Sequence, residues 1–221
     1  MPRLKEVLII GDSQATLSCK PGKPCPTTGA ALDLLLTQLG NKVTRSGHAG
    51  KSTSYLYKYA KANLKRQWDE VYIIAGGNDV PAMPSSVADL LLYFEPSGSV
   101  FYLPLPPATI ASGRKTNQDF LFPKAAAFRE KKNALYKSVA TDLAFPVVLD
   151  FREAALSNAV KQPSGVVYPT QRDGYHTRGK TAEEVAAYIV GKRNSAVTGY
   201  SVVILSALAA GALAFYLARR R

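Results

Sequence analysis

Histidine and cysteine are scarce in this chain, which has two residues of each among 221. An ordinary zinc site is not predicted, because no second pair of cysteines or histidines accompanies Cys19 and Cys25. A Pro-Gly pair lies between these two cysteines and would let the loop fold back on itself. The sequence is therefore compatible with a small disulfide loop and equally with two separate thiols.

The chain also lacks a secretory signal at its start and a dense tract of basic and aromatic residues. Only a few apolar residues lie between Lys5 and Asp12, too few for the apolar core of a signal peptide. The formal net charge of +12 favours contact with anionic surfaces such as lipid headgroups, acidic glycans or nucleic acid. Because the basic residues are scattered and not interleaved with aromatic ones, we do not expect nucleic acid to be the partner.

Charge is missing altogether from Ser195 to Ala218, and three arginines follow. As a helix this segment would reach roughly 36 Å, enough to cross a hydrocarbon core of about 30 Å. Tyr200 and Tyr216 lie near its two ends, where interfacial aromatic residues are common. We therefore predict a folded domain at 1–193, a short linker at 194–198, a transmembrane helix at 199–218 and a basic tail at 219–221.

This prediction makes the chain a single-pass membrane protein held in a lipid bilayer by its C-terminal helix. Ala207 and Gly211 form a small-xxx-small pair that would let two such helices associate in a homo-oligomer, although a monomer fits as well. Basic residues flank the segment on both sides, so the charge rule does not decide which side of the membrane carries the domain. A cellular membrane and a virion membrane both fit the pattern.

Segments typical of strands and of helices alternate up to about residue 193. Strands are predicted at Glu6–Ile10, Lys42–Arg45, Glu70–Ala75, Val100–Leu103 and Val147–Asp150. Helices are predicted at Gly29–Leu39, Ser54–Gln67, Ser86–Tyr93 and Pro123–Leu143, with a last one from Thr181, where Thr181 and Glu184 match a capping box. The longest irregular connection is Pro104–Gln118, which is either a plain surface loop or a loop that covers substrate. This alternation is typical of an α/β protein with a parallel sheet covered on both faces.

The first strand ends in Gly11, Asp12 and Ser13, which is an ordinary turn sequence and also a suitable place for a nucleophile. A serine hydroxyl needs a base to take its proton, and near neutral pH that base is nearly always histidine. His176 has Asp173 three residues upstream, a spacing that can bring the carboxylate against the imidazole ring. His48 has no acidic residue within four positions, so His176 is the candidate base.

Acyl transfer also requires donors for the oxyanion that develops in the transition state. Gly50 follows the second predicted strand and offers a backbone amide. Asn78 follows the third strand and offers a side-chain amide, beside Gly76, where the backbone can approach closely. In a doubly wound sheet these strand ends lie at one edge.

In this order the motifs GDSQ, GHAG, GGND and DGYH resemble the four sequence blocks of the SGNH hydrolases, also called the GDSL esterase/lipase superfamily. The resemblance covers about residues 6–190. It implies Ser13 as nucleophile, His176 as base and Asp173 as the acid that orients it. It further implies an oxyanion hole made of the Ser13 and Gly50 amides and the Asn78 side chain.

The fold that the resemblance implies is a flavodoxin-like three-layer α/β/α sandwich with a five-stranded parallel sheet. One departure from the family pattern is Gln14, which stands where leucine is usual. Since that position is not part of the chemistry, the departure concerns the substrate more than the mechanism.

The resemblance implies a serine ester hydrolase that works through an acyl-enzyme and needs neither a metal nor a cofactor. For this chain we expect a membrane-anchored carboxylic ester hydrolase that removes acetyl or short acyl groups from a cell-envelope glycan or lipid. The alternative is a membrane-tethered interaction or assembly module in a cell envelope or virion membrane, with an idle site, because a fold does not guarantee an activity.

Overall fold

The computed structural model describes residues 3–103, 110–111, 131–150, 154, 157, 159–161, 167–171 and 177–193. Several predictions concern residues outside these ranges: Asp173 and His176, the linker at 194–198, the transmembrane helix at 199–218 and the tail at 219–221. Within the described ranges, no helix combines the length and the apolar character that crossing a membrane requires.

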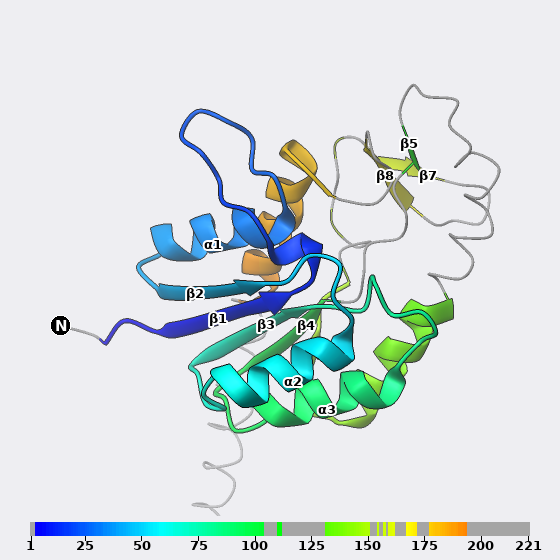
Figure 1. Ribbon diagram of the computed structural model, residues 1–221. Helices are drawn as coiled ribbons and strands as arrows, with labels where there is room; N and C mark the ends of the chain where they lie inside the picture. The colour runs from blue at the N-terminus through cyan, green and yellow to red at the C-terminus, as the bar shows by residue number, and fades with distance from the viewer. Residues whose placement is uncertain are drawn as a thin grey trace, which may run out of the picture.

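A five-stranded parallel sheet forms the centre of the protein (Figure 1). Its strands are β1 (Glu6–Gly11), β2 (Lys42–Gly47), β3 (Glu70–Ile74), β4 (Val100–Leu103) and β6 (Val147–Val148). They lie in the order β2-β1-β3-β4-β6, and every pairing is parallel. The structure thus confirms the predicted five-stranded parallel sheet, and its strand order is the flavodoxin-like one.

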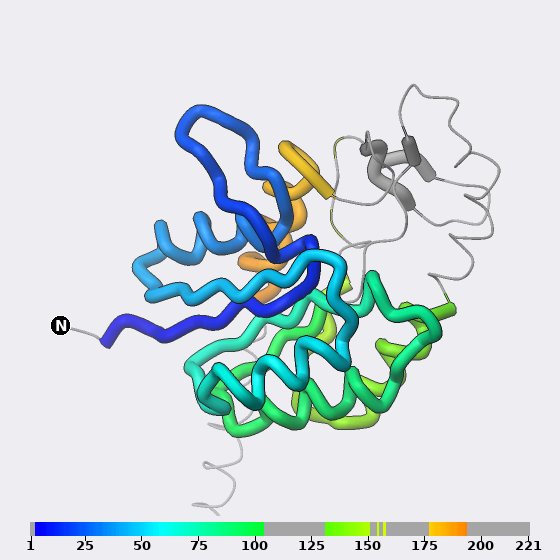
Figure 2. The backbone as a smooth tube through the Cα atoms, in the orientation of Figure 1, coloured from blue at the N-terminus to red at the C-terminus, as the bar shows by residue number. Residues whose placement is uncertain are grey.

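Helices cover both faces of this sheet, as the ribbon and the tube in Figures 1 and 2 show. One face carries α1 (Thr28–Gln38) and a helix at residues 180–193; the other carries α2 (Thr53–Asn63), α3 (Pro84–Phe94) and a helix at residues 131–142. The alternation of side chains along β1 explains the two layers. Val7 and Ile9 pack on the α1 side, whereas Leu8 and Ile10 pack on the α2 side. All four are fully buried, and the burial of each such side chain contributes about 1.5–3 kcal/mol to the stability of the fold.

Two predicted helix ends are wrong. The second helix ends at Asn63 and not at Gln67, because Leu64 adopts an extended conformation. The last helix begins at residue 180, where the Glu183 amide donates to the Gly179 carbonyl oxygen, so Thr181 lies inside the helix. The side chain of Glu184 accepts a hydrogen bond from the Ser157 amide, so the predicted capping box is not the one that the helix uses.

A second, small sheet was not predicted. It consists of β5 (Ile110–Ala111), β7 (Ala159–Lys161) and β8 (Val167–Gln171), in the order β5-β8-β7. β5 pairs with β8 in parallel and β7 pairs with β8 in antiparallel orientation. The connection predicted to be irregular, Pro104–Gln118, therefore contains a strand at its centre.

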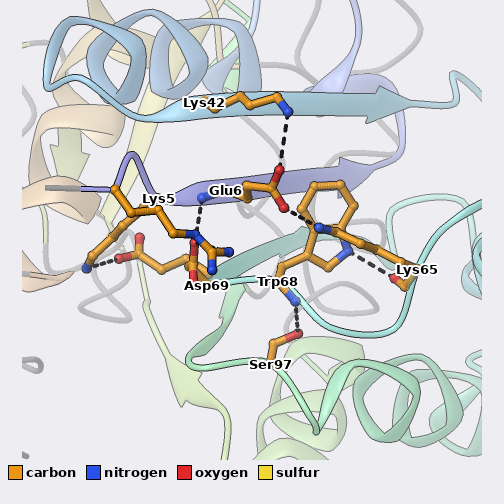
Figure 3. A network of polar contacts seen from close by, with 9 residues as sticks. Lys5, Glu6, Lys42, Lys65, Trp68, Asp69 and Ser97 are labelled. Atoms are coloured by element: carbon orange, nitrogen blue, oxygen red, sulfur yellow. Dashed lines mark hydrogen bonds and ion pairs between the residues drawn. The ribbon is translucent and has the colours of Figure 1, made fainter. Parts of the chain in front are cut away.

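The amino edge of the main sheet is held by a polar network (Figure 3). The Glu6 carboxylate pairs with Lys42 at the start of β2 and with Lys65 after α2. The Glu6 amide in turn donates to Asp69 at 2.7 Å, just before β3. Exposed ion pairs of this kind contribute only about 0–1 kcal/mol each to the free energy of unfolding.

Candidate active site

Three of the predicted site residues follow neighbouring strands at the carboxyl edge of the main sheet. Ser13, Gly50 and Asn78 lie shortly after the ends of β1, β2 and β3 respectively. Gly11, the last residue of β1, is paired with the last residues of both β2 and β3. The three turns therefore start side by side. Asp173 and His176 lie outside the described residues, but Thr177, which directly follows His176, is described.

The backbone around Ser13 packs so closely against its neighbours that two positions, Gly11 and Gly47, have no room for a side chain. Ser13 opens a short 3-10 helix, η1 (Ser13–Ala15). A Cβ atom added to Gly11 would lie 2.3 Å from the Ile74 carbonyl oxygen, and one added to Gly47 would lie 2.4 Å from the Ala15 carbonyl oxygen. Both glycines are thus needed for β2, β3 and the Ser13 turn to approach so closely.

Asp12 fixes the same turn with a buried carboxylate. One carboxylate oxygen accepts the Gln14 amide at 3.0 Å and caps η1, and the other accepts the Gly77 amide at 3.2 Å. The Asp12 amide donates to the Ile74 carbonyl oxygen at 3.0 Å. From its sequence context Asp12 is expected only to help form a turn, whereas in the structure it ties the turn of Ser13 to the turn of Asn78.

The second turn presents Gly50 at the surface. Gly50 has a φ of +71°, which L side chains rarely adopt, and an added Cβ would meet nothing within 4 Å. Asn78 joins this turn, because its side-chain amide donates to the Lys51 carbonyl oxygen at 3.2 Å. An asparagine amide has two N–H donors, so one remains for a ligand at this edge.

Asp79, the residue after Asn78, is a fully buried hub behind this edge. Its carboxylate accepts from the amide of Thr53 at 2.7 Å, from the Thr53 hydroxyl at 2.6 Å and from the Tyr136 hydroxyl at 2.7 Å. Lys132 donates to the carbonyl oxygens of Gly77 and Asp79, each at 3.2 Å. Burial, together with the bond to Asp79, raises the pKa of Tyr136, so its hydroxyl stays protonated and donating.

Sequence reasoning missed this hub. The GGND motif contains Asp79 and was the available signal, but nothing in the sequence indicated that Tyr136 would reach it from a helix 57 positions further along.

His48 belongs to an aromatic cluster beside the second turn. Its ring centroid lies 4.1 Å from that of Tyr59 and 5.5 Å from that of Tyr55, and its Nε2 is hydrogen-bonded to the Ser46 hydroxyl at 2.9 Å. Burial and the nearby Lys51 charge lower the pKa of His48, so the ring is neutral at pH 7.

Gln14 connects the Ser13 turn to the residue after His176. The Thr177 hydroxyl donates to the Gln14 side-chain oxygen at 3.0 Å, and the Thr28 hydroxyl lies 2.5 Å from the Thr177 hydroxyl. All three side chains are buried. The chain next to His176 therefore lies beside the chain next to Ser13.

A disulfide closes the loop beside these residues and decides between the two alternatives for the cysteines. Cys19 and Cys25 are bonded, with their Cα atoms 4.6 Å apart. The Cys25 carbonyl oxygen accepts the Gly179 amide at 2.8 Å, and the Cys25 amide donates to Glu183 at 3.1 Å. The disulfide loop thus holds the first turn of the helix at 180–193. Across the described ranges, no three histidine, cysteine, aspartate or glutamate residues form a group that would hold a metal ion.

Comparison with known proteins finds esterases among the solved structures of similar fold. No protein-family model matches the chain, and no curated protein sequence matches it. The carbohydrate acetylesterase Est24 from Sinorhizobium meliloti matches with a TM-score of 0.53 at 15% identity, covering 87% of this chain and 99% of Est24. This chain therefore shares its fold with solved esterase structures.

Two further structures agree. The acetylxylan esterase Axe2 from Geobacillus stearothermophilus matches with a TM-score of 0.54 at 16% identity, covering 84% of this chain and 92% of Axe2. The aryl esterase of M. smegmatis matches with a TM-score of 0.53 at 15% identity, covering 86% of this chain and 99% of that enzyme. At these identities the likeness establishes the fold, and the activity has to be argued from the residues.

Proposed function

We propose that this protein is a serine ester hydrolase in which Ser13 is the nucleophile. The observation that carries the proposal is the contact between Gln14 and Thr177 at 3.0 Å, because it brings the neighbour of Ser13 to the neighbour of His176. Ser13 also follows β1, an interior strand of the sheet, at the carboxyl edge, where open α/β sheets bind their ligands. Gly50 and Asn78 follow the two strands that flank β1.

In the proposed reaction, His176 accepts the proton of the Ser13 hydroxyl as the oxygen attacks the ester carbonyl. The negative charge that forms on the carbonyl oxygen is bound by the amides of Ser13 and Gly50 and by the Asn78 side chain. The alcohol leaves with the proton from His176, and an acyl-enzyme remains. His176 then takes a proton from water as the water attacks the acyl group, and it returns this proton to the Ser13 oxygen when the acid leaves. Asp173 orients and stabilises the imidazolium.

The proposed substrate is an acetyl or other short acyl ester on a carbohydrate. Est24 is a carbohydrate acetylesterase and Axe2 is an acetylxylan esterase, so two proteins of this fold act on acylated carbohydrate. The net charge of +12 favours an anionic polymer over a neutral one. A lipid ester is the alternative that a substrate panel has to distinguish.

We also propose that residues 199–218 anchor the protein in a membrane. The helix at 180–193 starts beside the disulfide loop at the Ser13 edge, and Arg193 is the last of its described residues. Arg193 pairs at 2.8 Å with Glu70, the first residue of β3, at the opposite edge of the sheet. An anchor that follows Arg193 would thus be attached to the domain at the end opposite to Ser13. This supports a polymer substrate over a lipid of the same bilayer.

A fluorophosphonate probe tests the esterase. We would treat the full chain in mild detergent and measure labelling together with acetate release from acetylated oligosaccharides. Ser13→Ala should abolish both, while Ser85→Ala, which changes an exposed serine on α3, should leave both unchanged. If the wild type takes no label, or if Ser13→Ala is still labelled, the esterase proposal is wrong and the interaction module replaces it.

Flotation with lipid vesicles tests the anchor. The full chain should float with the vesicles at high salt, and a variant with Leu208→Asp and Leu213→Asp should stay in the soluble fraction. Charged residues at the centre of a spanning helix cost about 2.5–3.5 kcal/mol each, which is enough to prevent insertion. Flotation of both proteins, or of neither, would contradict the anchor.

A further inference from the structure

We propose that Gln14, Thr177 and Thr28 form a positioning device that sets the placement of His176 against Ser13. The inference rests on the proposed function, since it assigns His176 the role of base. These three side chains come from η1, from the chain before the helix at 180–193 and from the first residue of α1. Their exposed fractions are 3%, 1% and 4%, so they exchange hydrogen bonds with each other away from water.

The direction of the two hydrogen bonds follows from the donors available. The Gln14 Oε1 atom can only accept a hydrogen bond, so the Thr177 hydroxyl must donate its single proton to Gln14. The bond between the two threonine hydroxyls, at 2.5 Å, must then be donated by Thr28. The chain of bonds therefore runs from Thr28 through Thr177 to Gln14, and the Thr177 hydroxyl is fixed from two sides.

Fixing Thr177 fixes the backbone next to the proposed base. Consecutive Cα atoms are 3.8 Å apart, so Thr177 determines where the chain leaves His176. Gln14 directly follows Ser13 in the chain, so fixing Gln14 likewise determines where the chain leaves Ser13. The two residues are separated by 163 positions in the sequence, and this hydrogen bond is a direct side-chain link between the two turns.

Gln14 makes this link possible. Leucine, which is usual at this position in the family that the sequence resembles, could not form it. A leucine side chain can fill the space but has no atom that accepts a proton from Thr177. A misplacement of about 1 Å between reacting groups can cost about 100-fold in rate. Gln14 is accordingly a positioning residue for the reaction, and its effect should fall on kcat and not on KM.

The test compares single and double variants of the full chain in detergent, with kcat and KM measured on an aryl acetate. Gln14→Leu and Thr177→Val should each lower kcat by about 10- to 100-fold at unchanged KM. The double variant should be no slower than the slower single one, because both changes break the same bond. Thr177→Ser keeps the hydroxyl and should retain nearly full kcat. Thr37→Val removes an exposed hydroxyl elsewhere on α1 and serves as the matched control.

The outcomes separate this inference from the proposed function. If the wild type is active but Gln14→Leu and Thr177→Val keep kcat within twofold, the positioning role is overturned and the esterase stands. If Thr177→Ser is as slow as Thr177→Val, the hydroxyl is not the group that matters, and the inference fails too. A wild type without Ser13-dependent activity overturns both. Thermal unfolding of each variant shows whether a loss of kcat reflects a loss of fold.

Discussion

The carboxylate of Asp12 accepts the backbone amide of Gly77 at 3.2 Å, so a side chain at the end of β1 holds the turn at the end of β3. Its other oxygen accepts the amide of Gln14, within η1. The Asp12 carboxylate is 1% exposed, and without it the buried Gln14 amide and the half-buried Gly77 amide would both lose this acceptor. The turn of Ser13 and the turn of Asn78 are in this way parts of one hydrogen-bonded unit.

Replacing Asp12 by asparagine should destabilise the protein. The asparagine side chain has one oxygen, so either the buried Gln14 amide or the half-buried Gly77 amide would face an NH₂ group and lose its acceptor. A buried donor left unsatisfied costs about 1–3 kcal/mol. Urea unfolding of Asp12→Asn should show a loss of this size, while Asp89→Asn, an exposed position on α3, should change stability by less than about 0.5 kcal/mol. Equal stability of both variants would mean that Asp12 does not join the turns.

Reducing the disulfide should loosen the segment around Thr177 as well as the loop that it closes. Cys19 and Cys25 are six positions apart, and a disulfide that closes a loop of this length raises the free energy of unfolding by about 2 kcal/mol. Cys25 also contacts Gly179 and Glu183, so the segment that follows His176 depends on it. Adding dithiothreitol should lower the unfolding free energy of the wild type by about that amount.

The variant with Cys19→Ala and Cys25→Ala is the control for reduction, because it has no disulfide to break. It should be about as stable as the reduced wild type and should not respond to dithiothreitol. A wild type whose stability is the same with and without dithiothreitol would show that the disulfide does not contribute.

The main sheet could be predicted from the sequence because local patterns determine it. β1, β3 and β4 are short runs of buried apolar residues, and each stands between segments of helical periodicity. The turns after them were recognisable because their glycines and polar residues have the right types at the right strand ends. Such signals lie within a few residues of one another.

The contacts between distant segments could not be predicted in this way. Gln14 was interpreted as a neighbour of the nucleophile without a part in the chemistry, because its partner Thr177 is 163 positions away. Glu184 fitted a local capping box, but it bonds Ser157 across 27 positions. In both cases a polar side chain found a partner that only the folded chain brings near, and tertiary contact outweighed the local motif.

Acid should weaken the fold through Glu70. Burial alone would raise the pKa of this carboxyl, but the hydrogen bonds and charges of Arg193 and Lys5 outweigh burial and lower it. A carboxyl whose pKa is lower in the folded than in the unfolded state, where it is about 4.3, stabilises the fold above that pH. The contribution is lost as the pH falls through the folded-state pKa.

Glu70→Gln isolates this contribution from that of other carboxyl groups. At pH 7 the variant should be less stable than the wild type by about 3–5 kcal/mol, because Arg193 loses its buried partner. The difference in unfolding free energy should shrink when urea unfolding is repeated at pH 3. A difference that stays constant between pH 7 and pH 3 would contradict the role of the Glu70 charge.

His48 should become charged only at a lower pH than an ordinary histidine. Burial is the main cause of its lowered pKa and the charge of Lys51 is the second. In NMR spectra, the His48 ring signal, assigned by its loss in His48→Gln, should have a midpoint below 6.5. Lys51→Met should move that midpoint upward, because a repelling charge is removed. If His176 is the base, the pH at which ester hydrolysis begins should be the same in His48→Gln as in the wild type. An onset that shifts in that variant would assign the titrating group to His48 and would reopen the choice of base.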